Sequence, residues 1–151
     1  MIEFEVITVV EAPPDACFDL SRDLDFHQES FGHTDESIVG GRASGLIGLN
    51  EEVTWRARHF GFYHEHTARI TALDSPRHFR DEMTKGRFLS FVHDHYFEPV
   101  PAGTRMRDVV EFQAPMGIIG RVVEALVLKR YMHRLIASRS EAIRVRAESG
   151  C

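Results

Sequence analysis

The sequence is poor in cysteine. Its 151 residues include two, Cys17 and Cys151, which are too few for a disulfide framework or for a zinc site built from cysteine ligands. It also lacks a run of about 20 apolar residues, which a transmembrane helix requires. The N-terminus lacks the basic and then apolar layout of a secretory signal. We therefore expect a cytoplasmic protein with no stable membrane insertion.

Positive charge is also scarce. Lysine and arginine total 18 against 23 acidic residues, for a net charge of -5, which argues against nucleic acid as a partner. Apolar residues make up 43% and charged residues 27%, which are ordinary values for a globular chain. The length suits one hydrophobic core. We expect a single domain over residues 1–151 and leave its oligomeric state open.

The first part of the chain predicts a strand followed by two short helices. Residues 2–10 alternate apolar and polar positions, as a half-buried strand does. Pro14 suits the first turn of a helix. Asp23 is a typical N-cap for a second short helix, which we expect Phe31-Gly32 to close.

The rest of the chain predicts a series of long strands and then one long helix. A strand near residues 35–39 leads into the glycine-rich stretch 40–50, which is open between a loop and a bulged strand. Strands of about ten residues follow from Glu51, separated by short turns. After Ala114 the pattern predicts a helix of about 30 residues. Its apolar stripe comprises Ile119, Val123, Leu126, Val127, Tyr131, Leu135, Ala142 and Val145.

This order has no βαβ alternation, so it predicts an α+β fold. A sheet of about seven antiparallel strands must twist and coil, and the last helix is the element long enough to cover its concave face. The expected architecture is therefore a curved sheet around a long C-terminal helix.

Several sequence segments suggest a family. Ala12-Pro13-Pro14 opens the first helix, and Pro115-Met116-Gly117-Ile118-Ile119-Gly120 introduces the last. Together with the element order, they resemble the START-like (SRPBCC) superfamily, which contains the polyketide cyclase/dehydrase family, the coenzyme-Q-binding proteins and the birch-pollen-allergen fold. The segments His93-Asp94-His95-Tyr96-Phe97 and Asp108-Val109-Val110-Glu111-Phe112 are similar to those of a bacterial ligand-binding branch. The resemblance implies a helix-grip fold with a cavity for hydrophobic molecules and, in some branches, catalysis.

Turn positions predict which side chains meet across the strands. A two-residue turn at residues 61–62 would pair His59 with His64. A four-residue turn at residues 100–103 would pair His95 with Asp108. The concave face of the two strands around residue 61 would then carry Val53, Trp55, Ala57, His59, His64, His66, Ala68 and Ile70.

The same register predicts two separate histidine groups. With a three-residue turn at residues 85–87, six residues separate the level of His66 from that of His93, which is about 20 Å. His93 and His95 with Asp108 match no common zinc signature, and neither does the group around His66. We therefore expect no metal and no cofactor.

The pair of His95 and Asp108 supports two hypotheses. It fits a general base that a carboxylate orients. It also fits a buried polar pair that satisfies itself or binds a ligand oxygen, which is the commoner role of such groups. We favour the second hypothesis and keep His95 and Asp108 as candidate catalytic residues only.

The concave face is expected to be apolar and aromatic with a few charges. Asp81 is the least expected member, because a carboxylate among apolar side chains is costly unless it is paired. The candidate ligand-binding residues are Trp55, Ala68, Ile70, Asp81, Met83, Phe91, His93, His95, Phe97, Met106, Asp108, Val110 and Leu126.

These observations favour a protein that binds or carries a small hydrophobic or aromatic ligand, such as a lipid, a quinone or a polyketide-like molecule. One alternative is a cyclase- or dehydratase-type enzyme that uses His95 and Asp108. Another is a protein-interaction module whose exposed helix or sheet edge docks a partner.

Overall fold

The computed structural model describes residues 1–30, 35–114, 122 and 124–150. The predicted helix end at Phe31-Gly32, the segment 115–120 and Val123 lie outside the described residues. The elements in chain order are β1 (Ile2–Val10), α1 (Pro14–Arg22), α2 (Leu24–Ser30), β2 (Ser37–Gly41), β3 (Glu52–His59), β4 (Phe62–Asp74), β5 (His78–Lys85), β6 (Ser90–Val100), β7 (Gly103–Gln113), η2 (Glu124–Leu128) and α4 (Lys129–Glu148).

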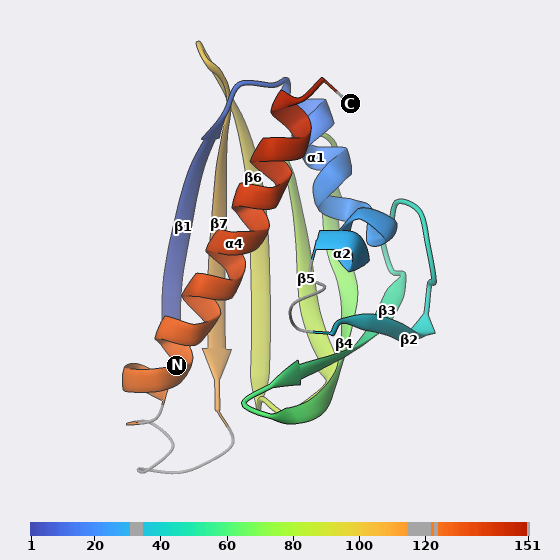
Figure 1. Cartoon of the computed structure of the whole chain (residues 1–151), viewed down its shortest axis with the longest axis vertical. Coiled ribbons are helices and arrows are strands. Elements are labelled where there is room, and N and C mark those ends of the chain that lie inside the picture. Colours follow the sequence, from blue (N-terminus) through green and yellow to red (C-terminus); the bar gives the residue numbers. More distant parts are fainter. Residues whose placement is uncertain (31–34, 115–121, 123, 151) are drawn as a thin grey trace.

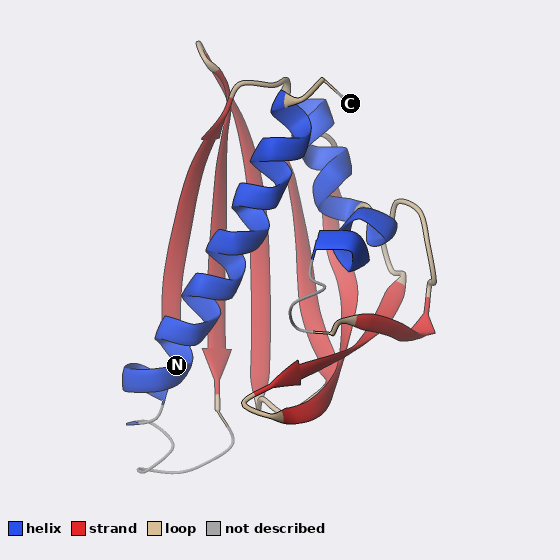
Figure 2. Cartoon of the chain, in the orientation of Figure 1, coloured by secondary structure: helices blue, strands red, loops and turns tan. Residues whose placement is uncertain are grey.

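Seven antiparallel strands form one sheet in the order β1-β7-β6-β5-β4-β3-β2. Helix α4 crosses one face of this curved sheet, and α1 and α2 lie beside it near one end (Figures 1 and 2). The predicted α+β helix-grip architecture is thus confirmed. None of the described helices has both the length and the apolar character needed to cross a bilayer.

The two short helices begin where their capping residues predict. Pro14 is the first residue of α1, a position at which a missing N–H breaks no helical hydrogen bond. The Oδ1 atom of Asp23 accepts hydrogen bonds from the backbone amides of Asp25 and Phe26, at 3.0 and 3.1 Å, and so caps α2. Phe18 and Phe26 are buried, so each helix contributes an aromatic side chain to the core.

The β3–β4 hairpin turns one residue earlier than predicted. Phe60 and Gly61 form its turn and have φ values of 53° and 81°, because a two-residue turn that matches the strand twist needs positive φ at both positions. His64 therefore lies opposite Ala57 instead of His59. The register has moved by two residues, an even number, so the predicted side chains still point to the concave face.

The register of β6 and β7 is the predicted one, with His95 directly opposite Asp108. The β5–β6 connection is longer than the predicted three-residue turn, because pairing of these strands ends at Glu82 and Val92. This longer connection changes the relative position of the two histidine groups.

The two histidine groups lie closer together than predicted. His66 is four residues along β4 from Ile70, which pairs with Asp81, and Asp81 pairs with His93. At about 3.3 Å per residue this is about 13 Å instead of about 20 Å. The ring of His66 in fact contacts that of Phe91, two residues before His93, with centroids 5.4 Å apart.

The C-terminal helix differs from its prediction in the face that it buries. A π-helical turn, η2, directly precedes the 20-residue α4, and several of the first residues of the predicted helix lie outside the described part of the chain. The predicted stripe is wrong at Leu126, Val127 and Val145, which are exposed. The buried face consists of Ile136, Ser140, Ile143 and Ala147, whose spacing of four, three and four residues follows one side of an α-helix.

Candidate ligand-binding site

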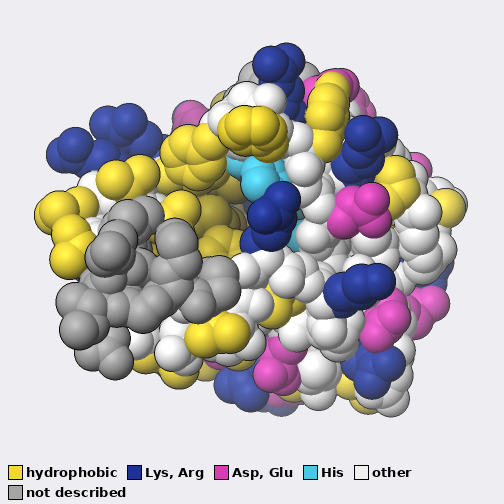
Figure 3. Space-filling model, turned by 90° about the horizontal axis from the view of Figure 1, so that it is seen from below, with side chains coloured by type: hydrophobic (Ala, Val, Ile, Leu, Met, Phe, Trp, Pro, Cys, Tyr) yellow, Lys and Arg dark blue, Asp and Glu magenta, His cyan; other side chains and the backbone are white. Residues whose placement is uncertain are grey.

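A cavity of about 610 Å³ lies between α4, α2 and the inner face of β3 and β4. This exceeds the roughly 300 Å³ typical of the smallest ligand pockets. Seen from one end of the molecule, apolar side chains line a hollow, and histidine and a Lys or Arg side chain are visible at its edge (Figure 3). The apolar lining residues are Leu24, Ile47, Val53, Trp55, Ala57, Phe60, Ala68, Ile70, Phe79, Phe88, Phe91, Ala114, Leu128, Tyr131, Met132, Leu135 and Ile136.

The polar lining residues are fewer and come from several elements. They are Ser21, Asp23, His27, Glu36, His59, His64, Glu65, His66, Asp81, Arg87 and Arg139. A largely apolar wall with a few placed polar groups is the usual composition of a site for a small organic ligand.

Behind one wall of the cavity lies a network of five polar side chains, which we call the buried His–Asp network: Asp81, His93, His95, Asp108 and Ser140. Nε2 of His95 donates a hydrogen bond to Oδ2 of Asp81 at 2.7 Å, and Nε2 of His93 donates to Oδ1 of Asp108 at 2.9 Å. Ser140 on α4 donates from Oγ to Oδ2 of Asp108 at 3.0 Å. The network therefore ties the long helix to the middle of the sheet.

The charges in this network favour one protonation pattern. Both ring nitrogens of His95 face carboxylates, at 2.7 Å from Asp81 and 3.3 Å from Asp108, which suits an imidazolium. Burial lowers the pKa of His95, but its hydrogen bonds to Asp108 and Asp81 outweigh burial and raise it above its ordinary value. Burial and the neighbouring charge of His95 lower the pKa of His93.

The two carboxylates of the network are held ionised. Burial alone raises the pKa of Asp81 and of Asp108, yet the hydrogen bonds and charges of His93 and His95 more than offset it and bring both pKa values well below their ordinary value. Arg139 on α4 adds a further positive charge that stabilises the Asp81 carboxylate.

Asp81 is the member of this network that meets the cavity. Its side chain is 20% exposed, whereas that of His95 is 3% exposed. Asp81 is also among the lining residues, while His93, His95 and Asp108 are not. The predicted functional pair of His95 and Asp108 is therefore close to the site, but it lies behind the cavity wall.

A second polar group gathers around Tyr131 of α4. Its hydroxyl is hydrogen-bonded to Nδ1 of His59, and its ring contacts that of Phe60, with centroids 4.5 Å apart. Nε2 of His64 donates to the carbonyl oxygen of His59 at 3.2 Å. Nearby, burial lowers the pKa of His66, so this cavity side chain is a neutral imidazole at neutral pH.

Helix α2 contributes His27 to a third wall. Its Nε2 donates to Oε1 of Glu36 at 2.6 Å, and its ring stacks on that of Trp55, with centroids 4.2 Å apart. Burial lowers the pKa of His27 even though the bond to Glu36 opposes this shift. The stack gives the cavity a flat aromatic wall that includes Trp55, the single tryptophan of the chain.

One group of potential metal ligands occurs in the described part of the chain: Asp81, His93 and His95, with ligand atoms within 4.8 Å of one another. The two imidazole rings stack, with centroids 3.7 Å apart and an angle of 22° between their planes. Lone pairs lie in the ring planes, so those of two stacked rings do not converge on one ion. This arrangement does not fit a metal site.

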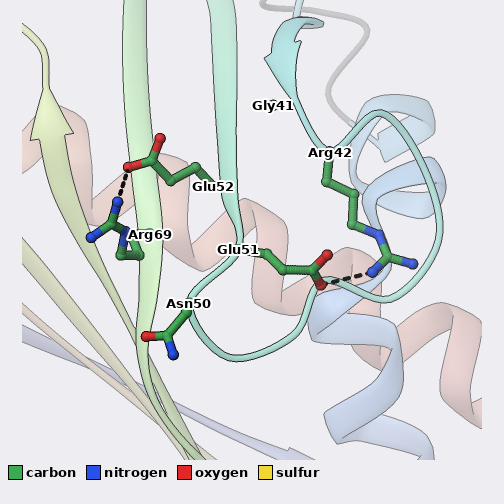
Figure 4. Close-up of a pocket in the computed structure, with 6 residues that line it drawn as sticks. All are labelled: Gly41, Arg42, Asn50, Glu51, Glu52 and Arg69. Carbon is green, nitrogen blue, oxygen red and sulfur yellow. Dashed lines mark hydrogen bonds and ion pairs between the residues drawn. The ribbon is translucent and has the colours of Figure 1, made fainter.

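A second depression on the surface involves Gly41, Arg42, Asn50, Glu51, Glu52 and Arg69 (Figure 4). Arg42 pairs with Glu51 at 2.7 Å, and Arg69 pairs with Glu52 at 2.8 Å. Because each guanidinium already has a carboxylate partner, this depression offers little to an anionic or apolar ligand.

The structure divides the predicted ligand-binding residues into three sets. Trp55, Ala68, Ile70, Asp81 and Phe91 line the cavity. The second set lies behind the wall, either in the buried His–Asp network or in the hydrophobic core: His93, His95, Phe97, Met106, Asp108 and Val110. Of the other two, Met83 is half-buried, packs against the core and does not line the cavity. Leu126 is 69% exposed and does not line the cavity. It lies in the π-helical turn, where its side chain leaves the predicted apolar face of the helix.

Many of the lining residues outside the predicted ligand-binding set come from the helices, although Tyr131 and Leu135 belong to the predicted apolar stripe. On the C-terminal helix they are Leu128, Tyr131, Met132, Leu135, Ile136 and Arg139. Their spacing of three and four residues marks one helical face, but the sequence alone did not show how that face turns relative to the sheet. His27 and Glu36 were missed because His27, which is hydrogen-bonded to Glu36, reaches the cavity wall by stacking on Trp55, a residue distant in sequence.

Comparisons with a family model and with solved structures agree on the type of fold. The model of the family described as "Polyketide cyclase / dehydrase and lipid transport" matches residues 1–148. The solved structure of TTHA0849 from Thermus thermophilus superposes with a TM-score of 0.80 and 18% identity, covering 99% of both chains. Ara h 8.0201 gives 0.70 and 14%, covering 98% of both chains. Ginseng major latex-like protein 151 from Panax ginseng gives 0.68 and 12%, covering 96% of both. No curated protein sequence matches significantly.

Proposed function

This chain belongs to the family of polyketide cyclases/dehydrases and lipid-transport proteins, and we propose that it binds and carries a small, largely apolar ligand in the cavity between α4 and β3–β4. Proteins of this family are associated with hydrophobic ligands, and the cavity gives that association a physical site. The ligand class is a compact aromatic or alicyclic molecule, such as a quinone, a polyketide-like compound or a lipid.

The observation that carries this proposal is the cavity of about 610 Å³ with its apolar and aromatic wall. Each Å² of apolar ligand surface removed from water contributes about 25 cal/mol. The stacked rings of His27 and Trp55 and the side chains of Phe88 and Phe91 offer flat surfaces to a planar ligand.

Binding is favoured over catalysis because of the position of His95. Its side chain is 3% exposed and both of its ring nitrogens face carboxylates, so it has no free nitrogen with which to take a proton from a ligand. A catalytic role through His95 and Asp108 would require the buried His–Asp network to open.

The test is a titration with N-phenyl-1-naphthylamine, a neutral apolar dye that becomes fluorescent in an apolar environment. We expect saturable binding to the purified protein, with energy transfer from Trp55. The variant Ala68→Trp places a large side chain in the cavity and should weaken binding about tenfold or more, because it removes apolar contact area for the dye. Ala57→Leu tests the same point with a smaller change.

The matched control is Thr71→Trp, which adds the same side chain to an exposed position of β4. It should leave dye binding unchanged. The proposal is wrong if the wild-type protein binds no dye, or if the Ala68 and Ala57 variants bind it as tightly as Thr71→Trp does.

A further inference from the structure

The carboxylate of Asp81 is paired on one oxygen only. Oδ2 accepts the hydrogen bond of His95 and lies 4.0 Å from Nδ1 of His93. Among the described residues no side-chain hydrogen bond or ion pair reaches Oδ1. Because Asp81 lines the cavity, it offers a free acceptor to whatever occupies the space.

This acceptor is held in place from behind. His95 fixes Oδ2 at 2.7 Å, and His95 is itself fixed between the stacked rings of Phe79 and His93, with centroids 4.0 and 3.7 Å away. A carboxylate whose orientation is fixed before binding loses little conformational entropy when a ligand donates to it. The fixed carboxylate therefore favours a ligand that donates a hydrogen bond in one defined direction over a ligand that is merely polar.

The surrounding charges select among ligands that donate hydrogen bonds. Arg139 lines the cavity, donates from Nη2 to the carbonyl oxygen of Ser21 at 2.7 Å, and stabilises the Asp81 carboxylate by its positive charge. Together with the cationic His95 it offsets the charges of Asp81 and Asp108, so the described residues at this site leave no unpaired charge to stabilise a ligand ammonium or carboxylate. Either ion would lose its hydration on entering the apolar cavity, and a carboxylate would also be repelled by Asp81. A neutral hydroxyl group avoids both costs.

On the basis of the binding function proposed above, we infer that the ligand carries a neutral hydroxyl group, phenolic or alcoholic, which donates a hydrogen bond to Oδ1 of Asp81. The apolar body of the ligand then lies toward Trp55 and Ala68. Asp81 is in this account a specificity-determining residue, and the rest of the buried His–Asp network positions it.

The test is displacement of N-phenyl-1-naphthylamine by five compounds that share the biphenyl scaffold: biphenyl, 4-methoxybiphenyl, 4-phenylphenol, biphenyl-4-carboxylate and 4-phenylbenzylamine. Removing a hydroxyl from water costs affinity unless the protein replaces its hydrogen bonds. We expect 4-phenylphenol to bind the wild-type protein about tenfold more tightly than 4-methoxybiphenyl, as a hydrogen bond to a charged acceptor allows. Biphenyl-4-carboxylate and 4-phenylbenzylamine should both bind more weakly than 4-phenylphenol.

Variants then assign the preference to Asp81. Asp81→Asn keeps the size and an oxygen for His95, but it turns an NH2 group toward the ligand, so the preference for the phenol should fall to about twofold or less. The matched control Glu82→Gln, on the next residue of β5 and pointing to the other face, should keep the wild-type preference.

The wild-type series decides the inference even if a variant does not fold. If biphenyl binds but its hydroxyl gives no advantage, or if the amine binds more tightly than the phenol, the inference is wrong while the carrier function stands. If neither the dye nor biphenyl binds, both fail. A preference that survives Asp81→Asn would also overturn the role of Asp81.

Discussion

The concave face of this sheet has a packed half and an open half. On β6 and β7 the inner positions include Phe97, Met106 and Phe112, which are buried and do not line the cavity, and α4 packs against the adjacent edge strand β1. On β3 and β4 the corresponding positions include Ala57 and Ala68, which line the cavity. In Figure 1, α4 runs from the β1 side of the sheet toward α1.

The difference shows what makes a cavity in this fold. The curvature of the sheet sets the space between sheet and helix, and side-chain volume decides whether that space is filled. Phenylalanine and methionine fill it at the packed half, whereas alanine leaves it empty at the open half. The buried His–Asp network lies at the boundary, with Asp108 toward α4 and Asp81 toward the cavity.

The largest effect is expected from a truncation in the packed half. Phe112→Ala should lower the free energy of unfolding by about 3–5 kcal/mol, because it removes a fully buried ring and leaves a void. Leu135→Ala removes a half-buried side chain beside existing space and should cost less than half as much. Urea unfolding of both variants measures the difference, and equal losses would contradict the division into two halves.

Removal of Asp108 should be nearly as costly. Asp108→Ala leaves His93, His95 and Ser140 without their common acceptor, and breaking a buried charge pair by removing one partner costs about 3–5 kcal/mol. We expect about 3 kcal/mol, because the Asp108 side chain keeps 11% exposure. A loss below about 1 kcal/mol in the same urea experiment would show that the network does not stabilise the fold.

Acidification should destabilise the protein between about pH 7 and about pH 5. Burial lowers the pKa of His27, His66 and His93 from the ordinary 6.5, so the folded state binds fewer protons there than the unfolded state. The contribution of these three histidines to the free energy of unfolding is fully present above pH 6.5. It is lost as the pH falls below 6.5 toward the lower pKa values of the folded state.

One histidine opposes this trend. The pKa of His95 is raised, so its contribution is fully present below 6.5 and is lost as the pH rises through its folded value. Because three histidines have a lowered pKa and one has a raised pKa, we expect a lower Tm at about pH 5 than at about pH 7. His66→Phe should reduce this difference in Tm. Thermal unfolding followed by circular dichroism measures both. A Tm that rises on acidification would contradict the assignment.

The smallest effect is expected from closing the open half slightly. Ala57→Leu adds apolar volume to existing space and should raise stability by up to about 1 kcal/mol, while it weakens binding of the dye. A strong loss of stability would mean that the space around Ala57 is already filled, and the open half would not differ from the packed half.

The sequence predicted the architecture because its signals are local. Alternation in residues 2–10, the capping role of Asp23 and the turn before β7 each depend on neighbours in the chain, and the last of these placed His95 opposite Asp108. These features required no knowledge of distant contacts.

The site was predicted less completely because it depends on distant contacts. Asp81 was recognised as an unusual carboxylate, but its partner was not, since the bond from His95 runs diagonally across two strands whose register depended on the length of the connection between them. The cavity faces of α2 and α4 depend on how these helices rotate against the sheet, which periodicity does not define. Small side chains such as Ala57 carry no signal by themselves that they border empty space.

A crystal structure of the protein with 4-phenylphenol bound tests the binding site most directly. We expect the two rings between Trp55, Ala68 and Leu135, with the hydroxyl within hydrogen-bonding distance of Oδ1 of Asp81 and the ring of Phe112 unmoved. A structure in which side chains fill the space between α4 and β3–β4, with the compound bound only on the surface, would contradict the proposed site.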